Sequence, residues 1–236
     1  MLAKAIIMMK LSTEEEFVQV METCRSLFAH KLHDYGAAWR LLRIPSLTDQ
    51  LLIKARRIRS LEEKGSSLVD EGIVPEFIGL VNYSIIGLIQ IELGHTIDED
   101  LTVEQALELY DCKAAESLSL MLRKNHDYDE AWRAMRVSSY TDLILMKLFR
   151  VKQIEDLKGE TLVSEGIGAN YMDIMNYAVF GLIKLTIEEE AAFNRCLLVG
   201  PHQHHFAVGY IPVFRLRKSR RSDGNVHQAQ CIFGPF

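Results

Sequence analysis

The sequence has few cysteines and no pair of them at metal-binding spacing. Its four cysteines stand far apart in 236 residues and form no Cys-x-x-Cys motif. Structural zinc sites and disulfide frameworks need cysteines at closer or paired positions. We therefore expect free thiols in a reducing compartment, which favours a cytoplasmic location.

Positive charge is also scarce in most of the chain. Of the 27 basic and 32 acidic residues, residues 191–236 hold six and one, which leaves 21 basic and 31 acidic residues in 1–190. Binding to duplex DNA depends on positive surface that neutralises phosphates. We do not expect this acidic body to bind duplex DNA.

The chain lacks an uninterrupted apolar run of membrane-spanning length. The longest run, residues 77–93, contains Asn82, Ser84 and Glu92, whereas a spanning helix needs about 20 predominantly apolar residues. We expect a buried core helix here and no membrane partner. Alternating apolar and polar residues, typical of strands, are absent before residue 190, so the predicted fold class is all-α.

What the sequence does contain is an internal repeat. Residues 33–43 read HDYGAAWRLLR and residues 126–136 read HDYDEAWRAMR. The register is 93 residues at first and 94 after one inserted residue. The polar positions kept in both copies include Ser46, Thr48, Asp49, Lys54, Arg57, Glu62, Glu71 and Asn82, which recur as Ser139, Thr141, Asp142, Lys147, Arg150, Glu155, Glu165 and Asn176. We predict two tandem helical repeats packed as a bundle, over 1–95 and 96–188, and an irregular basic tail over 189–236 that is disordered or non-native.

Capping signals and apolar periodicity predict the helices of each repeat. Ser12 and Thr102 each begin a capping-box pattern, with Glu or Gln three residues on. We expect Thr48 and Thr141 to be N-caps of the next helices and Pro75 to lie in the first turn of a third. The expected second and third helices span 48–64 and 75–93 in the first repeat, and 141–158 and 169–185 in the second.

Two basic pairs are candidates for phosphate binding. Lys54 and Arg57 stand three residues apart, as do Lys147 and Arg150, so each pair shares one helix face. An arginine that binds two oxygens beside a lysine suits a phosphate. The alternative is that these cations pair with neighbouring acids, such as Glu62, Glu71 or Asp49.

Aromatic and amide side chains near these pairs are candidates for contact with a nucleobase. Trp132 or Tyr128 could lie against a base, although a tryptophan that anchors a small helical core is the commoner case. Asn176 and Tyr177 interrupt an apolar helix, and a buried asparagine must find partners. Either contact between helices or recognition of a ligand would supply them.

Carboxylates of the second repeat are candidates for chemistry. Asp173 has no counterpart in the first repeat, where Gly79 stands. Glu155, Asp173 and Asn176 offer oxygen ligands that suit Mg²⁺. The candidate catalytic residues are Asp127, Glu165 and Asp173.

The repeated pattern HDYxxAWR…SxTD…KxxR…E…EG…NY resembles the nucleotide modification associated domain family, type 1, over 30–90 and 123–185. This resemblance implies a helical fold and an association with nucleotide or DNA-base modification, without naming a reaction. The chain is also distantly similar to the MazG-type all-α nucleoside triphosphate pyrophosphohydrolases, which carry ExxE and ExxD motifs. Here the corresponding positions are Lys147-x-x-Arg150 and Asp173-x-x-Asn176.

We therefore expect a protein that handles a nucleotide or modified nucleotide by binding its phosphate. Hydrolysis with Mg²⁺ and assembly into a homo-oligomer are compatible with this expectation. The alternative is a non-catalytic helical module for structure or interaction, whose repeated polar residues form a buried network. The expected substrate-binding residues are Lys54, Arg57, Tyr128, Trp132, Arg133, Lys147, Arg150, Asn176 and Tyr177.

Overall fold

The computed structural model describes residues 11–65, 72–98, 100–159 and 165–193. The described residues form helices, turns and bends, with no strand among them. This confirms the all-α prediction. Most of the predicted irregular tail lies outside the described residues, but residues 189–193 are helical and continue the last helix.

The two repeats contain the same elements in the same order. The first has α1 (Thr13–Tyr35), the 3-10 helix η1 (Ala38–Leu41), α2 (Ile44–Lys64) and α3 (Val74–Leu93). The second has α4 (Val103–Tyr128), the 3-10 helix η2 (Ala131–Ala134), α5 (Val137–Asp156) and α6 (Gly166–Leu182). A π-helical segment, η3 (Ile183–Glu188), extends α6.

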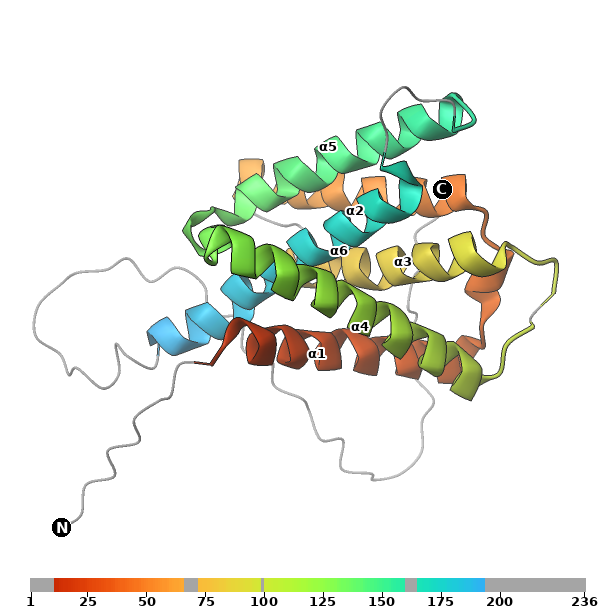
Figure 1. The fold of residues 1–236 in the computed structure, drawn as a ribbon, viewed down its shortest axis with the longest axis horizontal. Coiled ribbons are helices and arrows are strands. Elements are labelled where there is room, and N and C mark those ends of the chain that lie inside the picture. The colour runs from red at the N-terminus through yellow and green to blue at the C-terminus, as the bar shows by residue number, and fades with distance from the viewer. Residues whose placement is uncertain (1–10, 66–71, 99, 160–164, 194–236) are drawn as a thin grey trace, which may run out of the picture. The chain divides into compact units, whose positions relative to one another are not determined.

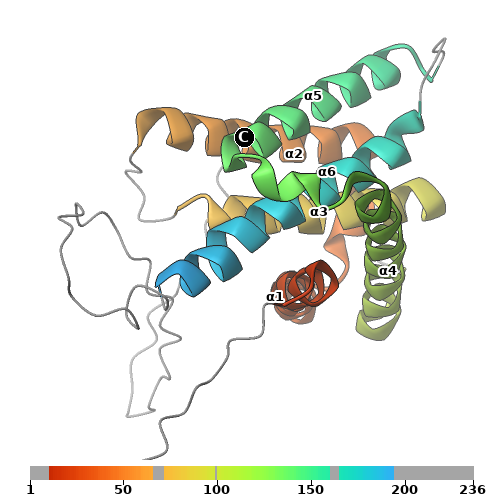
Figure 2. The same cartoon turned by 60° about the vertical axis from the view of Figure 1, so that its left-hand side comes forward.

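The helices are stacked in three layers, each made of one helix from each repeat. The third helices, α3 and α6, pack together in the middle layer. The helices α2 and α5 cover one side of this pair, and α1 and α4 cover the other (Figures 1 and 2). The repeats thus share one core.

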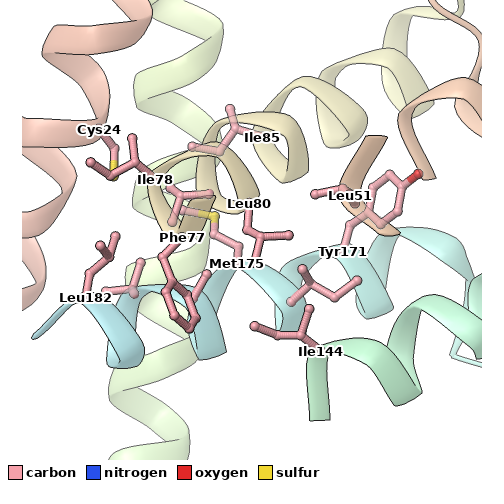
Figure 3. Packing of buried hydrophobic residues seen from close by; sticks show 14 of the residues in the cluster. Cys24, Leu51, Phe77, Ile78, Leu80, Ile85, Ile144, Tyr171, Met175 and Leu182 are labelled. Carbon is pink, nitrogen blue, oxygen red and sulfur yellow. The ribbon is translucent and has the colours of Figure 1, made fainter. Parts of the chain in front are cut away.

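Apolar side chains of all three layers meet around α3 and α6. Phe77 and Leu80 of α3 lie against Met175 of α6, with Leu51 and Ile144 reaching in from α2 and α5 (Figure 3). These side chains are fully buried. Burial of apolar surface at about 25 cal/mol per Å² is the main force that holds the repeats together.

Small residues allow the middle pair of helices to approach closely. A Cβ atom at Gly87 of α3 would collide with the ring of Tyr171, and one at Gly181 of α6 would come within 2.8 Å of the ring of Phe77. Gly87 and Gly181 are equivalent positions of the repeat, as are Phe77 and Tyr171. On each of these two helices, a glycine therefore packs against an aromatic ring of the other helix.

The predicted helix starts are partly confirmed. Both capping boxes, at Ser12 and Thr102, are present, and Pro75 lies in the first turn of α3. The N-cap prediction for Thr48 and Thr141 is wrong, because α2 and α5 begin four residues earlier. Both threonines lie buried within their helices, where tertiary contacts replace the capping role.

One described helix, α3, is long and apolar enough to cross a membrane by length and composition alone. About two thirds of its apolar stretch, 67%, is buried against the other helices. A buried core helix has the same composition, so this finding is weak support for a membrane span.

Candidate functional site

Repeated polar residues of α2 and α5 join the two repeats. Thr48 Oγ1 donates a 2.6 Å hydrogen bond to Glu155 Oε1, and the equivalent Thr141 Oγ1 donates a 3.0 Å bond to Glu62 Oε1. The phenol of Tyr171 also lies 2.7 Å from Thr48 Oγ1. The two equivalent hydrogen bonds relate α2 and α5 by a local two-fold axis. They explain why the threonine and the glutamate are both present in each repeat.

The next repeated acid makes a similar exchange at the surface. Lys152 of α5 donates to Asp49 of α2 at 2.7 Å, and Arg59 of α2 donates to Asp142 of α5. Each pair again crosses between the repeats. The aspartates of the SxTD motif therefore belong to the packing of the halves.

The repeated arginines of the AWR segments tie each 3-10 helix to the helical body. Arg133 donates to Glu130, Glu188, Glu16 and Thr13, with Glu16 at 2.7 Å. Arg40 is buried and binds both carboxylate oxygens of Asp100. The guanidinium of Arg133, a predicted substrate contact, is occupied by the protein itself.

Trp132 lies in the core, where it stacks on Phe180 with ring centroids 4.4 Å apart. The guanidinium of Arg133 lies over its ring at 4.3 Å. Of the two rings expected to lie against a nucleobase, Trp132 is thus buried and in contact with protein groups. The alternative, a tryptophan that anchors the core, is confirmed.

The repeated asparagines connect helices of different layers. Asn82 donates to the carbonyl of Cys24 at 3.1 Å and accepts a 2.9 Å hydrogen bond from Tyr110. Asn176 accepts a 2.8 Å bond from Ser117, but its buried Nδ2 has no hydrogen-bond partner in the part of the chain that the structure describes. Contacts between helices thus satisfy the hydrogen bonding of the amide nitrogen and the amide oxygen of Asn82, and of the amide oxygen of Asn176.

Both cations of the basic pair in the first repeat are bound to the same acid of α3. Lys54 and Arg57 both donate to the buried Glu76, Lys54 at 3.3 Å. Lys54 also lies 5.7 Å from the centre of the Tyr83 ring. Among the described residues, the pairing alternative is thus confirmed with Glu76, whereas Glu71, one of the expected acids, lies outside the described residues.

In the second repeat, cations from two helices converge on Asp173 of α6. Lys147 of α5 and Lys124 of α4 each lie 2.6 Å from one oxygen of this carboxylate. The side chains of Lys147 and Asp173 are only 9% and 10% exposed, whereas Lys124 is 51% exposed. Glu165 lies 3.7 Å from Lys147 at the rim.

The two lysines determine the charge of Asp173. Burial by itself would raise the pKa of this carboxyl, but the hydrogen bonds from Lys124 and Lys147 outweigh burial and hold the pKa below its ordinary value of 3.8. Asp173 is therefore an ionised acceptor and a weak base. Lys124 was not among the predicted site residues, although the sequence holds a signal for it, because a lysine, Lys31, also stands at the equivalent position of the first repeat.

Four further predicted residues stand on the three helices that carry this cluster. Arg150 is exposed, has no ion pair with the described residues and stands one turn from Lys147. Tyr128 and Asp127, 71% and 73% exposed, end α4 just after Lys124. Tyr177 is half-buried and stacks on Tyr140, with ring centroids 6.5 Å apart.

The predicted magnesium ligands are not brought together. Glu155 is bound to Thr48 at the boundary of the repeats, whereas Asp173 is bound to lysines and Asn176 to Ser117. Within the described ranges, no group of three or more His, Cys, Asp or Glu side chains is arranged to hold a metal ion. The residues present do not fit the expected Mg²⁺ site.

Comparison with known protein families identifies the family of this chain. The sequence model of nucleotide modification associated domain 1 matches residues 31–91 and again residues 124–185. The chain belongs to this family. Each of the two matches to nucleotide modification associated domain 1 runs from the end of the first helix of a repeat through its third helix. The family description ties the domain to nucleotide modification.

The comparisons add no closer relative of known activity. No curated protein and no solved structure matches the chain. The similarity to MazG-type pyrophosphohydrolases is not shown by these comparisons.

Proposed function

We propose that this protein binds the phosphate of a (deoxy)nucleotide where α4, α5 and α6 meet, as part of nucleotide or DNA-base modification. The observation that carries the proposal is the convergence of Lys124 and Lys147, from separate helices, on Asp173. Arg150 adds an exposed guanidinium one turn away on α5. We call Lys124, Lys147, Arg150 and Asp173 the lysine–aspartate site.

The exposed cations would make the contact with the ligand. Lys147 is almost buried and lies at the bottom of the site, whereas Lys124 and Arg150 reach solvent. Arginine can bind two phosphate oxygens at once, and lysine adds a mobile point charge. This division of roles changes the expected clamp, in which Lys147 and Arg150 acted alone.

The base of the nucleotide would lie against Tyr128. This tyrosine stands four residues after Lys124 and so lies on the same face of α4. Its ring is 71% exposed, and an exposed aromatic ring can stack a base. Tyr128 thus takes the role for which Trp132 is unavailable.

The proposal is one of binding and does not include a reaction. Glu165 and Asp173 both lie on Lys147, and Asp127 pairs with its neighbour His126 at 3.2 Å. A carboxylate bound to lysines is a poor general base because its pKa is lowered. Binding depends only on the cations.

A thermal-shift panel of nucleoside mono-, di- and triphosphates, with and without Mg²⁺, tests the proposal. A ligand at 100 times its dissociation constant should stabilise the fold by about 2.7 kcal/mol. Lys124→Ala and Arg150→Ala should each reduce this shift. Lys31→Ala is the matched control, since Lys31 is the repeat equivalent of Lys124 and is also exposed. The absence of any shift in the unmutated protein refutes the proposal.

The structural module is the second candidate function, and the reciprocal bonds of Thr48 and Thr141 favour it. These bonds assign much of the repeated polar set to packing between the repeats. If no nucleotide binds, and substitution of these threonines destabilises the protein, the structural module accounts for the repeat.

A further inference from the structure

Asp173 occupies the position that a ligand phosphate would need in the lysine–aspartate site. Its two oxygens each accept from a different lysine at 2.6 Å. Phosphate groups form charge-assisted hydrogen bonds of the same kind with lysine. We infer that Asp173 is an internal occupant of the phosphate site, displaced from Lys124 and Lys147 by an incoming terminal phosphate. This inference rests on the proposed function.

The first repeat shows that the fold does not require this carboxylate. Gly79 stands at the position of Asp173, and the side chain of Lys54 lies over it, with Cδ 2.7 Å from where a Cβ would be. Lys54 pairs instead with Glu76, one turn earlier. Lys31 forms no ion pair with the described residues of the chain. The equivalent helices of the first repeat, α1, α2 and α3, thus pack without a carboxylate at this position.

The second repeat keeps an alternative acceptor for its buried lysine. Asn170 stands at the position of Glu76, its side chain is fully buried, and its Oδ1 has no hydrogen-bond partner among the described residues. A buried, unpartnered polar atom calls for a specific explanation. In the first repeat the equivalent lysine binds the residue at this position, so Asn170 can accept from Lys147 when Asp173 moves.

Competition with a bound carboxylate selects the charge of the ligand. Asp173 carries one negative charge, so a displacing group must interact more strongly with the lysines than a single charge does. A terminal phosphate carries about −1.5 to −2 at pH 7, whereas each phosphate of a nucleic-acid backbone carries one charge. The site therefore favours the terminal phosphate of a free nucleotide over a phosphodiester.

Binding of inorganic phosphate and of dimethyl phosphate, a phosphodiester, tests the inference by titration calorimetry on the full chain. The unmutated protein should bind phosphate but not dimethyl phosphate. Asp173→Asn should bind phosphate about tenfold more tightly, which corresponds to about 1.4 kcal/mol, and should also bind dimethyl phosphate. Glu76→Gln, which removes the carboxylate of the first repeat, should leave the affinity for phosphate unchanged.

The outcomes separate this inference from the proposed function. Unchanged or weaker phosphate binding by Asp173→Asn, in a protein whose unmutated form binds phosphate, overturns the inference alone. The absence of phosphate binding in every form refutes both. If Asp173→Asn does not fold, as judged by circular dichroism, Asp173→Gly copies the first repeat and replaces it. Unfolding of both variants would show that the fold needs the carboxylate and would overturn the inference.

Discussion

Thr48 of α2 and Glu155 of α5 are joined across the two repeats by a hydrogen bond of 2.6 Å. Their repeat equivalents, Thr141 and Glu62, are joined in the opposite direction at 3.0 Å. A polar residue kept in both copies can therefore be kept for packing between the copies. The residues left for a ligand are those for which such a contact is not found, above all Arg150 and Tyr128.

Loss of one reciprocal hydrogen bond should destabilise the protein. Thr141→Val keeps the shape of the buried side chain but leaves the half-buried Glu62 without its donor. We expect a loss of roughly 1–3 kcal/mol in the free energy of unfolding, measured by urea denaturation. Thr23→Val is the control, because this exposed hydroxyl donates to a carbonyl of its own helix, Gln19 O. Equal effects of the two changes would contradict the proposed importance of the bond.

The same two glutamates should make stability depend on pH. Burial raises the pKa of Glu62 and of Glu155 above the ordinary value of 4.5, and the threonine hydrogen bonds offset this only in part. The folded state then binds more protons than the unfolded state just above pH 4.5. Stability contributed by these groups is thus lost as pH rises through the raised pKa values.

Urea unfolding at a series of pH values between about 4.5 and 7 checks this sign. The double variant Glu62→Gln, Glu155→Gln should show a smaller fall of stability over this range. Asp173 acts in a different window, since its pKa is lowered and its contribution is lost only below pH 3.8. If stability fell with rising pH by the same amount in the double variant as in the unmutated protein, the two glutamates would not be the source of the pH dependence.

The close approach of α3 and α6 should not tolerate larger residues. Gly181→Ala would bring a Cβ within 2.8 Å of the Phe77 ring, in a fully buried region. Overpacking of this kind costs about 1–3 kcal/mol, which thermal unfolding would detect. Gly72→Ala is the control, since an added Cβ there meets no atom of the described residues within 4 Å, and it should leave the melting temperature unchanged or raised.

The two lysines on Asp173 should differ in their effect on stability. Lys147→Ala removes the buried partner of a buried carboxylate and should cost about 3 kcal/mol. Lys124→Ala removes a half-exposed partner and should cost less than about 1 kcal/mol. Chemical denaturation of both variants measures the difference. Equal losses would show that Lys124 is as structural as Lys147 and would weaken its role in binding.

Some features of this site could be predicted from the sequence and others could not. The constant Lys147 and the change from Gly79 to Asp173 are visible in the repeat itself and indicate the second repeat as the place of a site. The contact between Lys124 and Asp173 could not be predicted, because it links positions 49 residues apart on two different helices. Nor could the sequence decide between a stacking and a core role for Trp132, since both use the same ring.

The local structure of this protein follows from its amino-acid sequence, because capping boxes at Ser12 and Thr102, apolar periodicity and the repeat specify helices through short-range contacts. Which polar groups meet depends on how the helices pack. Thr48 became a partner of Glu155 instead of an N-cap because packing of α2 on α5 buries its hydroxyl beside that carboxylate. Desolvation and ion pairing depend on neighbours distant in the chain, and those neighbours exist only once the helices have packed.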